Sequence, residues 1–367
     1  MAETGVVTMI DGKDAEGRLR VRLGERRARA MGSDRNKSMY VIVNPIAGKG
    51  YGARAVDQIK ERLSEKGLQF DMVTTTRAGE AVELARRAME DGYETIVAAG
   101  GDGTYQEVVS GMLAGSDDEI VGNLGIIPVG SGCDFSWTVG VPADLGEACA
   151  RLAEGRTRIV DVGKVTVDAI DAGAATEAQS QPQSATRYFD NAVGIGFDGV
   201  VTAECRKFRR LHGLPMYLVA VLKTVFLSFK PPRSVIEYEV DGQGAQALPN
   251  APQPSMRRLE KTVLMATVCN GQREGGGFHV APNAVNDDGR FDLCLADNIP
   301  RLQILGMIPH FMKGTHVDKP PVTMLRSRHV IVSSPDPLIA HADGEMICTN
   351  AHRIECEIAA RRVRVIY

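Results

Sequence analysis

The stretch Thr95-Ile96-Val97-Ala98-Ala99-Gly100-Gly101-Asp102-Gly103-Thr104 decides the fold class of this 367-residue chain. Its first half is an uninterrupted run of small and apolar residues, which predicts a buried strand. Its second half is rich in glycine, which predicts a tight loop. Tyr105 to Leu113 follows with apolar residues at helical spacing, so the whole unit is expected to be strand, loop and helix.

The same unit recurs on both sides of this stretch. Buried-type strands are predicted at Met39 to Val43, Phe70 to Thr75 and Leu124 to Val129. Helices are predicted around Val56, Ile59 and Leu63, and from Gly79 to Met89. Strands that alternate with helices indicate a parallel sheet covered on both faces, so residues 38–160 are expected to form a three-layer α/β domain.

After about residue 160 the alternation stops and strands dominate. They are predicted at Ile159 to Val167, Val235 to Val240, Lys261 to Asn270, Arg290 to Ala296 and Val330 to Ser333. Two helices, Leu211 to Phe229 and Arg301 to Lys313, interrupt them. Residues 161–350 are therefore expected to form a mainly β second domain, and residues 351–367 a strand segment that could return to the first domain.

Three segments have too little apolar content to pack in a core. Residues 1–37 are charged and are expected to be a poorly ordered extension. The polar tracts 171–186 and 242–257 are expected to be loop insertions in the second domain.

Composition excludes several classes of protein. A net charge of −3 gives no footprint for nucleic acid, so no nucleic-acid partner is expected. No run of 18 apolar residues is present. Seven scattered cysteines without a C-x-x-C pair argue against a disulfide framework or a zinc site and indicate a cytoplasmic protein.

Three glycine-bearing loops follow three of the predicted strands: Asn44 to Gly50, Gly100 to Thr104, and Gly130 to Gly132. The carboxyl ends of parallel strands meet at one edge of a sheet, where ligands bind. Glycines let backbone N–H groups approach a polyphosphate, and the helix after each loop adds its positive end. The first loop also offers Lys49, although its spacing is not that of a Walker A loop.

Acidic residues lie in or beside these loops. Asp102 could hold Mg²⁺ or bind a sugar or a phosphate-bound water, or it could cap the helix that begins there. The third loop supplies Ser131 as a hydroxyl facing phosphate and Asp134 as a second acid.

Other motifs have two interpretations each. Asp343-Gly344-Glu345 could supply a general base, or it could be a hairpin turn. Asn286 to Gly289 could bind a divalent cation or simply turn the chain. Gly194 to Gly199 matches G-x-G-x-x-G but lacks the acid that a dinucleotide fingerprint requires, so a tight turn is expected.

A basic cluster precedes the amphipathic helix predicted at Leu211 to Phe229. Its members are Arg206, Lys207, Arg209 and Arg210. Such a cluster suits an anionic membrane surface, and the alternative is a helix packed on the β domain.

Four motifs occur together in a fixed order. They are Asn44-Pro45-x-x-Gly48-Lys49, Gly100-Gly101-Asp102-Gly103-Thr104-x-x-Glu107, Gly130-Ser131-x-x-Asp134-Phe135 and Asp343-Gly344-Glu345. From residue 38 onward, the chain resembles lipid kinases of the diacylglycerol kinase catalytic-domain superfamily, soluble bacterial type, which are related to sphingosine and ceramide kinases. Phe189 to Asp198 also looks like a segment of that superfamily.

The resemblance implies an NAD kinase/phosphofructokinase-like α/β nucleotide-binding domain followed by a β-sandwich domain, with ATP in the cleft. It implies that the chain is an ATP-dependent lipid kinase with Asp343 as general base and Glu345 beside it. It places a structural Mg²⁺ at Asp288 and the carbonyls of Val285 and Arg290. The implied nucleotide contacts are Asn44, Pro45, Gly48, Lys49, Thr75, Gly100, Gly101, Asp102, Gly103, Thr104, Glu107, Ser131 and Asp134.

The third loop departs from the pattern of the superfamily, Gly-Thr-x-Asn-Asp-Phe-Ala-Arg. Cys133 replaces the Asn, and Ser136-Trp137 replace Ala-Arg, which removes one polar contact near the nucleotide or the lipid entry. A lipid acceptor at a membrane surface and a homodimer are the expected partners. Two rival functions stay open at this point: a soluble NAD kinase and a lipid-binding regulator that has lost catalysis.

Overall fold

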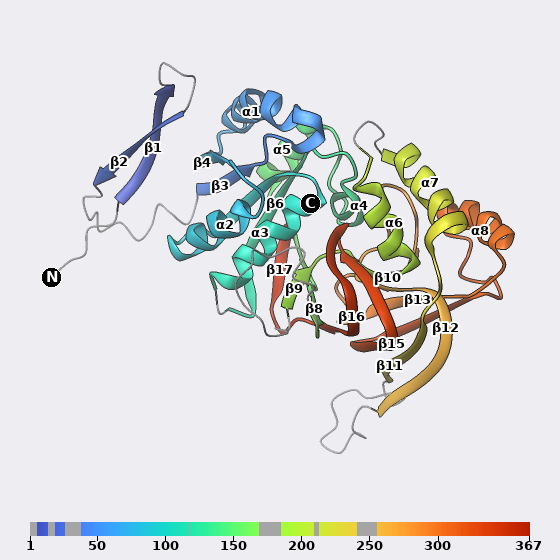
Figure 1. Ribbon diagram of the computed structural model, residues 1–367. Coiled ribbons are helices and arrows are strands. Elements are labelled where there is room, and N and C mark those ends of the chain that lie inside the picture. The colour runs from blue at the N-terminus through green and yellow to red at the C-terminus, as the bar shows by residue number, and fades with distance from the viewer. Residues whose placement is uncertain are drawn as a thin grey trace, which may run out of the picture.

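The computed structural model describes residues 6–13, 19–25, 38–116, 118–168, 185–208, 213–240 and 255–367. Two domains lie side by side, the first an α/β domain and the second a β domain with helices on one side (Figure 1). The α/β and β division expected from the sequence is confirmed.

The first domain is built on a six-stranded sheet of order β4-β3-β5-β6-β17-β7. Four adjacent strands, starting from the β4 edge, are parallel: β4 (Gln69–Thr74), β3 (Ser38–Val43), β5 (Thr95–Gly100) and β6 (Ile120–Pro128). The C-terminal strand β17 (Arg362–Ile366) pairs with β6 in parallel, and β7 (Thr157–Val160) closes the edge in the antiparallel direction. The chain therefore leaves this sheet, forms the second domain and returns.

Helices cover both faces of this sheet because its strands are apolar on both sides. Alternate residues such as Val41 and Val97 pack with α1 (Ala47–Glu65) and α5 (Leu145–Glu154). Their neighbours Ile42 and Ile96 pack with α2 (Glu80–Glu90) and α3 (Asp102–Ala114) on the other face. A short helix, α4 (Asp134–Thr138), follows β6.

The second domain is a nine-stranded antiparallel sheet that folds over on itself. Two long strands, β12 (Ser255–Cys269) and β15 (His329–Ala342), flank β10 (Ala192–Gly196) at one end and β11 (Arg233–Val240) at the other. The remaining strands are β13 (Phe291–Asp297), β14 (Val322–Ser327), β16 (Glu345–Ile358), β8 (Gly163–Val167) and β9 (Ala185–Phe189). One apolar core lies inside the fold of this sheet.

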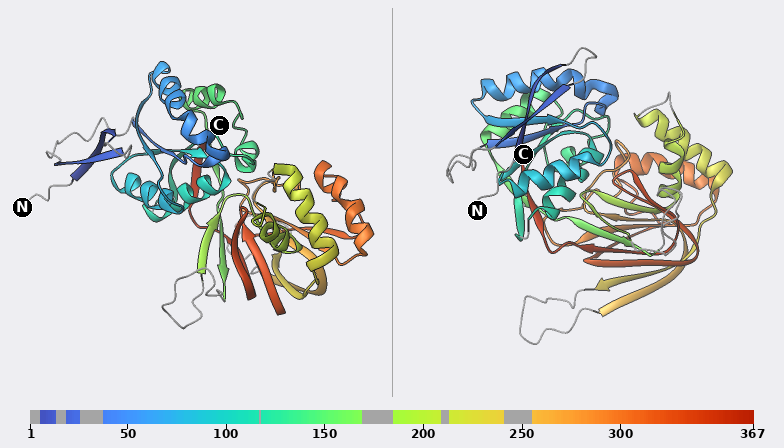
Figure 2. Two further views of the ribbon diagram at one scale, coloured as in Figure 1. Left: turned by 45° about the horizontal axis from the view of Figure 1, so that its top comes forward. Right: turned by 60° about the vertical axis from the view of Figure 1, so that its left-hand side comes forward.

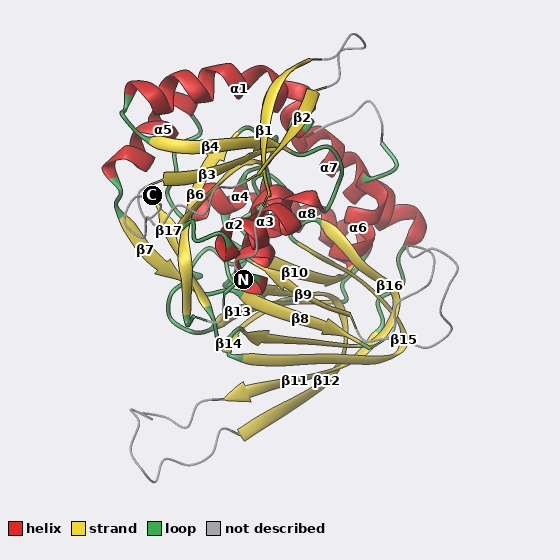
Figure 3. Cartoon of the chain, turned by 90° about the vertical axis from the view of Figure 1, so that its left-hand side faces the viewer, coloured by secondary structure: helices red, strands yellow, loops and turns green. Residues whose placement is uncertain are grey.

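Helices gather on the side of this sheet away from that core, as the turned views make plain (Figures 2 and 3). They are α6 (Phe197–Cys205), α7 (Gly213–Lys223), its π-helical continuation η3 (Thr224–Ser228) and α8 (Arg301–Lys313). A separate apolar cluster joins these helices to β12 and β13.

Three sequence-based boundaries need correction. The strand expected over Ile159 to Val167 is two strands in different sheets, because Asp161 leaves the ladder: its N–H donates to the carbonyl of Asn286 and its carboxylate accepts from Gly289. The domain boundary at residue 350 falls inside β16, which continues in the β domain to Ile358. The tracts expected as loops end inside strands, since β9 begins at Ala185 and β12 at Ser255; most of both tracts lies outside the described residues.

The N-terminal extension contains an antiparallel pair of strands, β1 (Val6–Lys13) and β2 (Leu19–Glu25). These two stretches lie within residues 1–37, for which the sequence predicts a poorly ordered extension, and that expectation stays a prediction. In the part of the chain that the structure describes, no helix is long and apolar enough to cross a bilayer. All seven cysteines are free thiols.

Candidate active site

The three glycine-bearing loops meet above the carboxyl ends of β3, β5 and β6 and line a cavity of about 490 Å³. Close backbone contact explains two of the glycines. A Cβ on Gly130 would lie 2.4 Å from the Cα of Gly101, and a Cβ on Gly48 would lie 2.3 Å from the carbonyl oxygen of Val129. The loops thus touch one another through backbone where a side chain would force them apart.

Most of the residues predicted to contact the nucleotide line this cavity. They are Asn44, Pro45, Gly48, Thr75, Gly101, Asp102, Gly103, Thr104, Glu107 and Ser131. Three predicted residues do not line it. Gly100 is packed against Thr104, Lys49 is exposed, and Asp134 faces the second domain.

The first loop has an unusual backbone. Gly48, Lys49 and Gly50 all have positive φ, at 55°, 58° and 81°, inside the first turn of α1. Asn44 ties this loop to the second one, since its Nδ2 donates to Thr104 Oγ1 at 3.0 Å. Successive left-handed residues aim backbone N–H groups into a concave surface, which suits an anion.

One wall of the cavity was only partly foreseen. Thr76, Arg77 and Ala78 lie beside Thr75 at the end of β4, so Arg77 brings a cation to the cavity that the sequence analysis missed. Its position directly after a predicted strand was the available signal. Glu107 also lines this wall, and its carboxylate accepts hydrogen bonds from the N–H groups of Gly79 and Ala81 at the start of α2. Glu107 therefore links α3 to α2.

Asp102 is not the helix cap that the alternative interpretation required. The N-cap of α3 is Gly101, and the Asp102 carboxylate instead accepts from the N–H of Phe135 at 2.9 Å. Burial and the nearby charge of Asp134 raise the pKa of Asp102 to about 6. A partly buried acid on a cavity wall with so raised a pKa is typical of a functional site.

The altered third loop is completed by the second domain. Asp134 accepts from the N–H of Gly276 at 2.7 Å and lies 3.2 Å from the guanidinium of Arg273. The same guanidinium stacks over Trp137, 4.5 Å from the centre of its ring. Arg273 therefore places a cation beside the loop that departs from the pattern of the superfamily, although it comes from a distant segment.

Asp343 lies in the hairpin turn between β15 and β16, so the turn interpretation and a role in the site hold together. Asp343 and Gly344 both have positive φ, at 48° and 80°. The Asp343 carboxylate accepts from three backbone N–H groups, those of Asp190, Asn191 and Ala192, at 2.8 to 3.0 Å. Burial raises the pKa of Asp343, and these donors oppose that rise.

Asp190 was missed by the sequence analysis. Its carboxylate is fully buried, and no donor among the described residues reaches either oxygen. Burial and the charges of Asp343 and Asp102 raise its pKa well above the ordinary value. Although Asp102 lines the cavity, these acids do not form a group of close metal ligands in the part of the chain that the structure describes, and both Asp343 oxygens already accept backbone hydrogen bonds.

Asp288, the carboxylate implied for a structural Mg²⁺, has a different environment. It forms an ion pair with Arg326, and its Oδ1 accepts from the N–H of Arg290 at 3.1 Å. Val285 belongs to the same turn and is exposed. A cation held by these three residues would have to displace the guanidinium of Arg326.

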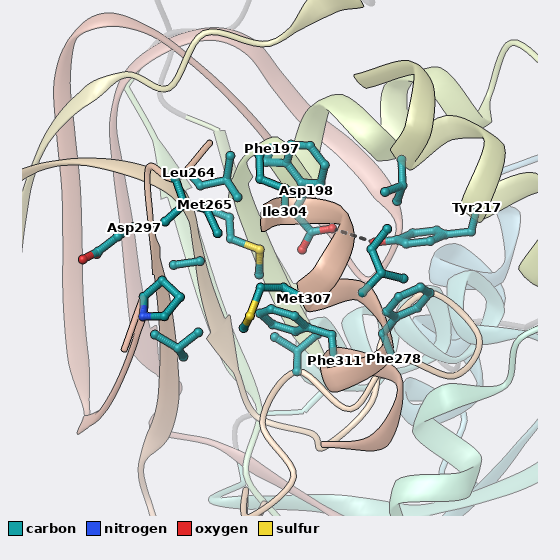
Figure 4. A pocket seen from close by; sticks show the side chains of 17 residues that line it. Phe197, Asp198, Tyr217, Leu264, Met265, Phe278, Asp297, Ile304, Met307 and Phe311 are labelled. Atoms are coloured by element: carbon teal, nitrogen blue, oxygen red, sulfur yellow. Dashed lines mark hydrogen bonds between the residues drawn. The ribbon is translucent and has the colours of Figure 1, made fainter. Parts of the chain in front are cut away.

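Two more cavities meet at Tyr217. The first, of about 290 Å³, lies between the domains and is lined by residues that include Asp102, Asp134, Tyr217, Glu274 and Asp343. The second, of about 70 Å³, lies under α7 and α8 and is almost entirely apolar (Figure 4). Tyr217 lines both, and its hydroxyl donates to Asp198 at 3.1 Å (Figure 4).

The basic cluster before α7 is partly neutralised. Arg206 pairs with Glu345 at 3.0 Å and Lys207 with Glu204 at 2.7 Å, while Arg209 and Arg210 lie outside the described residues. The amphipathic helix does pack on the β domain, as the alternative interpretation held. Its outer face still exposes Val219, Leu222 and Phe226.

Comparison with known proteins identifies both domains. Residues 38–165 match the family model "Diacylglycerol kinase catalytic domain", and residues 191–366 match "YegS C-terminal NAD kinase beta sandwich-like domain". A diacylglycerol kinase of Mycobacterium tuberculosis (strain ATCC 25618 / H37Rv) is 26% identical over 323 residues, 88% of this chain and 93% of that protein. A diacylglycerol kinase of Bacillus subtilis (strain 168) is 27% identical over 312 residues, 84% and 90% of the two chains.

A solved structure has the same fold. The crystal structure of a diacylglycerol kinase from Bacillus anthracis str. Sterne superposes with a TM-score of 0.59 at 21% identity, over 90% of this chain and 97% of that one. With both domains matched in order over most of the chain, this protein belongs to the superfamily of soluble bacterial-type lipid kinases that contain the diacylglycerol kinase catalytic domain.

Proposed function

We propose that this protein transfers the γ-phosphate of ATP to the hydroxyl of a lipid, with Asp343 as general base. One observation supports this most directly: the Asp343-Gly344 turn lines both the glycine-loop cavity and the interdomain cavity. The base takes a proton from the acceptor hydroxyl while that hydroxyl attacks the γ-phosphorus of ATP. It must therefore lie where the ATP site and the acceptor site meet.

The glycine-loop cavity is the proposed ATP site. Backbone N–H groups of the first and third loops, the N-terminus of α3 and the Arg77 side chain would receive the triphosphate. Mg²⁺ bound with the triphosphate would lie beside the Asp102 carboxylate on the cavity wall and would neutralise charge that develops on the phosphate oxygens. Exposed Lys49 lies outside the cavity wall, so we assign it no contact.

Asp343 is suited to accept a proton. Burial raises the pKa of its carboxyl, so the ionised form has a greater tendency to take the hydroxyl proton. The acceptor oxygen would then bond to the γ-phosphorus as ADP leaves with the electrons of the broken bond. Glu345 pairs with Arg206 at the rim, and we propose that it orients the turn and does not accept the proton.

The interdomain cavity is the proposed site of the acceptor head group. Its acids Asp102, Asp134, Glu274 and Asp343 would repel an acceptor that already bears phosphate. A neutral hydroxyl lipid fits this lining better. The apolar cavity behind Tyr217 would take part of an acyl chain, and this feature favours a lipid over NAD as the acceptor.

Peripheral contact with an anionic membrane is part of the proposal. The outer face of α7 and η3 exposes Leu222 and Phe226 beside Lys230, and no ion pair of Lys230 is found among the described residues. Apolar side chains with nearby cations suit a bilayer that contains acidic lipid. Phe226→Glu should reduce sedimentation with phosphatidylserine vesicles, whereas binding to ATP should stay as in the wild type.

A direct assay tests the main proposal. Purified protein is incubated with Mg²⁺ and ATP labelled at the γ-phosphate, and is offered diacylglycerol, monoacylglycerol, a sphingoid base, ceramide, an isoprenoid alcohol or NAD. We expect label in one or more lipids and none in NAD. Label in NAD alone would support an NAD kinase, and no turnover with any acceptor would support a binding protein without catalysis. We also propose the homodimer expected from the sequence, and size-exclusion chromatography of the purified protein tests it.

A further inference from the structure

A buried group of three ionisable side chains lies directly behind the Asp343 turn. His341 is fully buried, and its Nε2 lies 2.8 Å from Glu274 Oε1 and 3.6 Å from Asp198 Oδ2. Asp198 comes from α6, Glu274 from the loop after β12, and His341 from the end of β15. None of the three takes part in the proposed proton removal or phosphate transfer, although Glu274 also lines the proposed head-group cavity.

The other ring nitrogen of His341 reaches the turn itself. The N–H of Gly344 points to His341 Nδ1 at 3.2 Å. A backbone amide can only donate, so this hydrogen bond belongs to the neutral ring with its proton on Nε2, facing the two carboxylates, whose charges raise the pKa of His341. The ring therefore connects the buried acids on one side to the Asp343-Gly344 turn on the other.

Two hydroxyl groups hold Asp198, whereas His341 Nε2 and Glu274 Oε2 have no aligned hydrogen bond among the described residues. Tyr217 donates to Asp198 Oδ1 at 3.1 Å, and Thr267 donates to Asp198 Oδ2 at 3.4 Å. Gly194, which belongs to the G-x-G-x-x-G match, faces the group from β10: a Cβ there would lie 2.4 Å from both Asp198 Oδ2 and His341 Nε2. This glycine thus leaves room for a packed polar group.

A metal ion on the same three residues is the main alternative, because their ligand atoms lie within 4.8 Å of one another. An ion bound to Nε2 would require the ring proton on Nδ1. That proton would face the N–H of Gly344, donor against donor. The hydrogen bond to the turn therefore favours a proton, not a metal, on Nε2.

We infer that His341, fixed by Asp198 and Glu274, is a positioning residue that holds the Asp343-Gly344 turn in its left-handed conformation. Both residues of the turn have positive φ, and Asp343 lacks the freedom of glycine there, so the turn needs support from outside. Glu274 and Tyr217 also line the proposed head-group cavity. The residues that hold His341 in place would therefore contact the acceptor. The catalytic part of this inference rests on the proposed function.

Two variants separate positioning from simple neutralisation of buried acids. In His341→Asn the side-chain oxygen can take the place of Nδ1 and accept from Gly344, while the contact with the acids is lost. In His341→Gln the amide nitrogen takes the place of Nε2 and faces the acids, while the acceptor for Gly344 is lost. Positioning predicts that the Asn variant keeps kcat within a few-fold of the wild type and that the Gln variant loses on the order of 10- to 100-fold, with KM for ATP unchanged in both.

If His341 only neutralises the buried acids, the Gln variant should keep a kcat close to the wild type and the Asn variant should lose activity. That result would overturn the inference. Equal activity of both variants and the wild type would overturn it as well. Elemental analysis of the wild-type protein provides a further check, since one tightly bound transition metal per chain, lost in both variants, would mean a metal site.

Amide hydrogen exchange provides a readout that does not depend on the proposed function. Exchange over residues 340–346 should be faster in the Gln variant than in the Asn variant and the wild type, because only the Gln variant releases the N–H of Gly344. A wild-type protein that phosphorylates no acceptor would refute the proposed function, yet this exchange pattern would still test the positioning role. Unchanged exchange in the Gln variant would refute the positioning role alone.

Discussion

The glycine-loop cavity and the Asp343 turn are built in different ways, although they lie side by side. The cavity is lined largely by backbone from loops that each follow their own strand, so each loop forms from a contiguous stretch of chain. The turn depends on a distant segment, because its carboxylate is held by N–H groups of residues 190 to 192. Its glycine N–H reaches His341 only three residues away, but His341 contacts acids from two other segments, Asp198 and Glu274.

The difference shows where each half is vulnerable. Backbone that approaches a phosphate is disturbed by added volume, because a methyl group at a loop contact has no space. A buried carboxylate held by several donors is disturbed by lost charge or lost acceptors, because its donors are then left unpaired. Substitutions of each kind should therefore separate ATP binding from phosphate transfer.

Asp343→Asn should have the largest effect. It removes the proposed base, and with Oδ1 kept as the acceptor for Asn191 and Ala192 it puts an amide NH₂ against the backbone N–H of Asp190. We expect kcat for lipid phosphorylation to fall on the order of 10³-fold, with the Kd for ATP changed little, as measured by calorimetry. Asp287→Asn, an exposed acid in another turn, is the control and should keep full activity. Full activity of the Asp343 variant would refute its assignment as base.

Asp102→Asn should make the unliganded protein more stable. The pKa of Asp102 is about 6 in the folded protein and lower in the unfolded chain. The contribution of the protonated carboxyl to the free energy of unfolding is therefore complete below about pH 4 and is lost as pH rises through 6. At pH 8 the variant should be more stable by roughly 2–3 kcal/mol, from about 1.4 kcal/mol per pKa unit. The difference should vanish near pH 4, as measured by urea unfolding without ATP or Mg²⁺.

Two outcomes would contradict this prediction for Asp102. One is a wild-type protein that is the more stable of the two at pH 8, and the other is a stability difference that does not depend on pH. Asp118→Asn, on the surface, should show neither effect.

Gly130→Ala should weaken ATP binding. Its Cβ would meet the Cα of Gly101 at 2.4 Å, so the second and third loops would have to separate. We expect the Kd for ATP to rise about 10- to 30-fold, with a smaller change in kcat at saturating ATP. Gly306→Ala is the matched control, because it lies in α8 with no atom within 4 Å of the added Cβ. Equal ATP affinity in the two variants would show that the loop contact is not needed.

Arg77→Ala should have the smallest effect of the four. Arg77 is a cation on the cavity wall, so its loss removes one charged contact with the triphosphate. We expect the Kd for ATP to rise about 5- to 10-fold and to depend less on salt concentration than in the wild type. Arg87→Ala, which removes a surface pair with Glu83 on α2, serves as the control. An unchanged Kd for the Arg77 variant would remove this side chain from the proposed site.

The sequence by itself determined the features that depend on neighbouring residues. Strand, loop and helix around Gly100 to Thr104 follow from local periodicity and from glycine, and the meeting of three such loops follows from the geometry of a parallel sheet. Ten of the thirteen predicted nucleotide contacts line one cavity for this reason. The helix at Arg301 to Lys313 has the predicted bounds.

Only the tertiary structure decided the features that join distant segments. Asp161 breaks a run that is strand-like throughout, because its partners Asn286 and Gly289 lie more than 120 residues away. Asp190 has no local signal, and its importance appears only when burial brings it next to Asp343. Arg273 beside Trp137, and His341 between two acids and a turn, are likewise products of long-range packing, which periodicity and motif spacing do not encode.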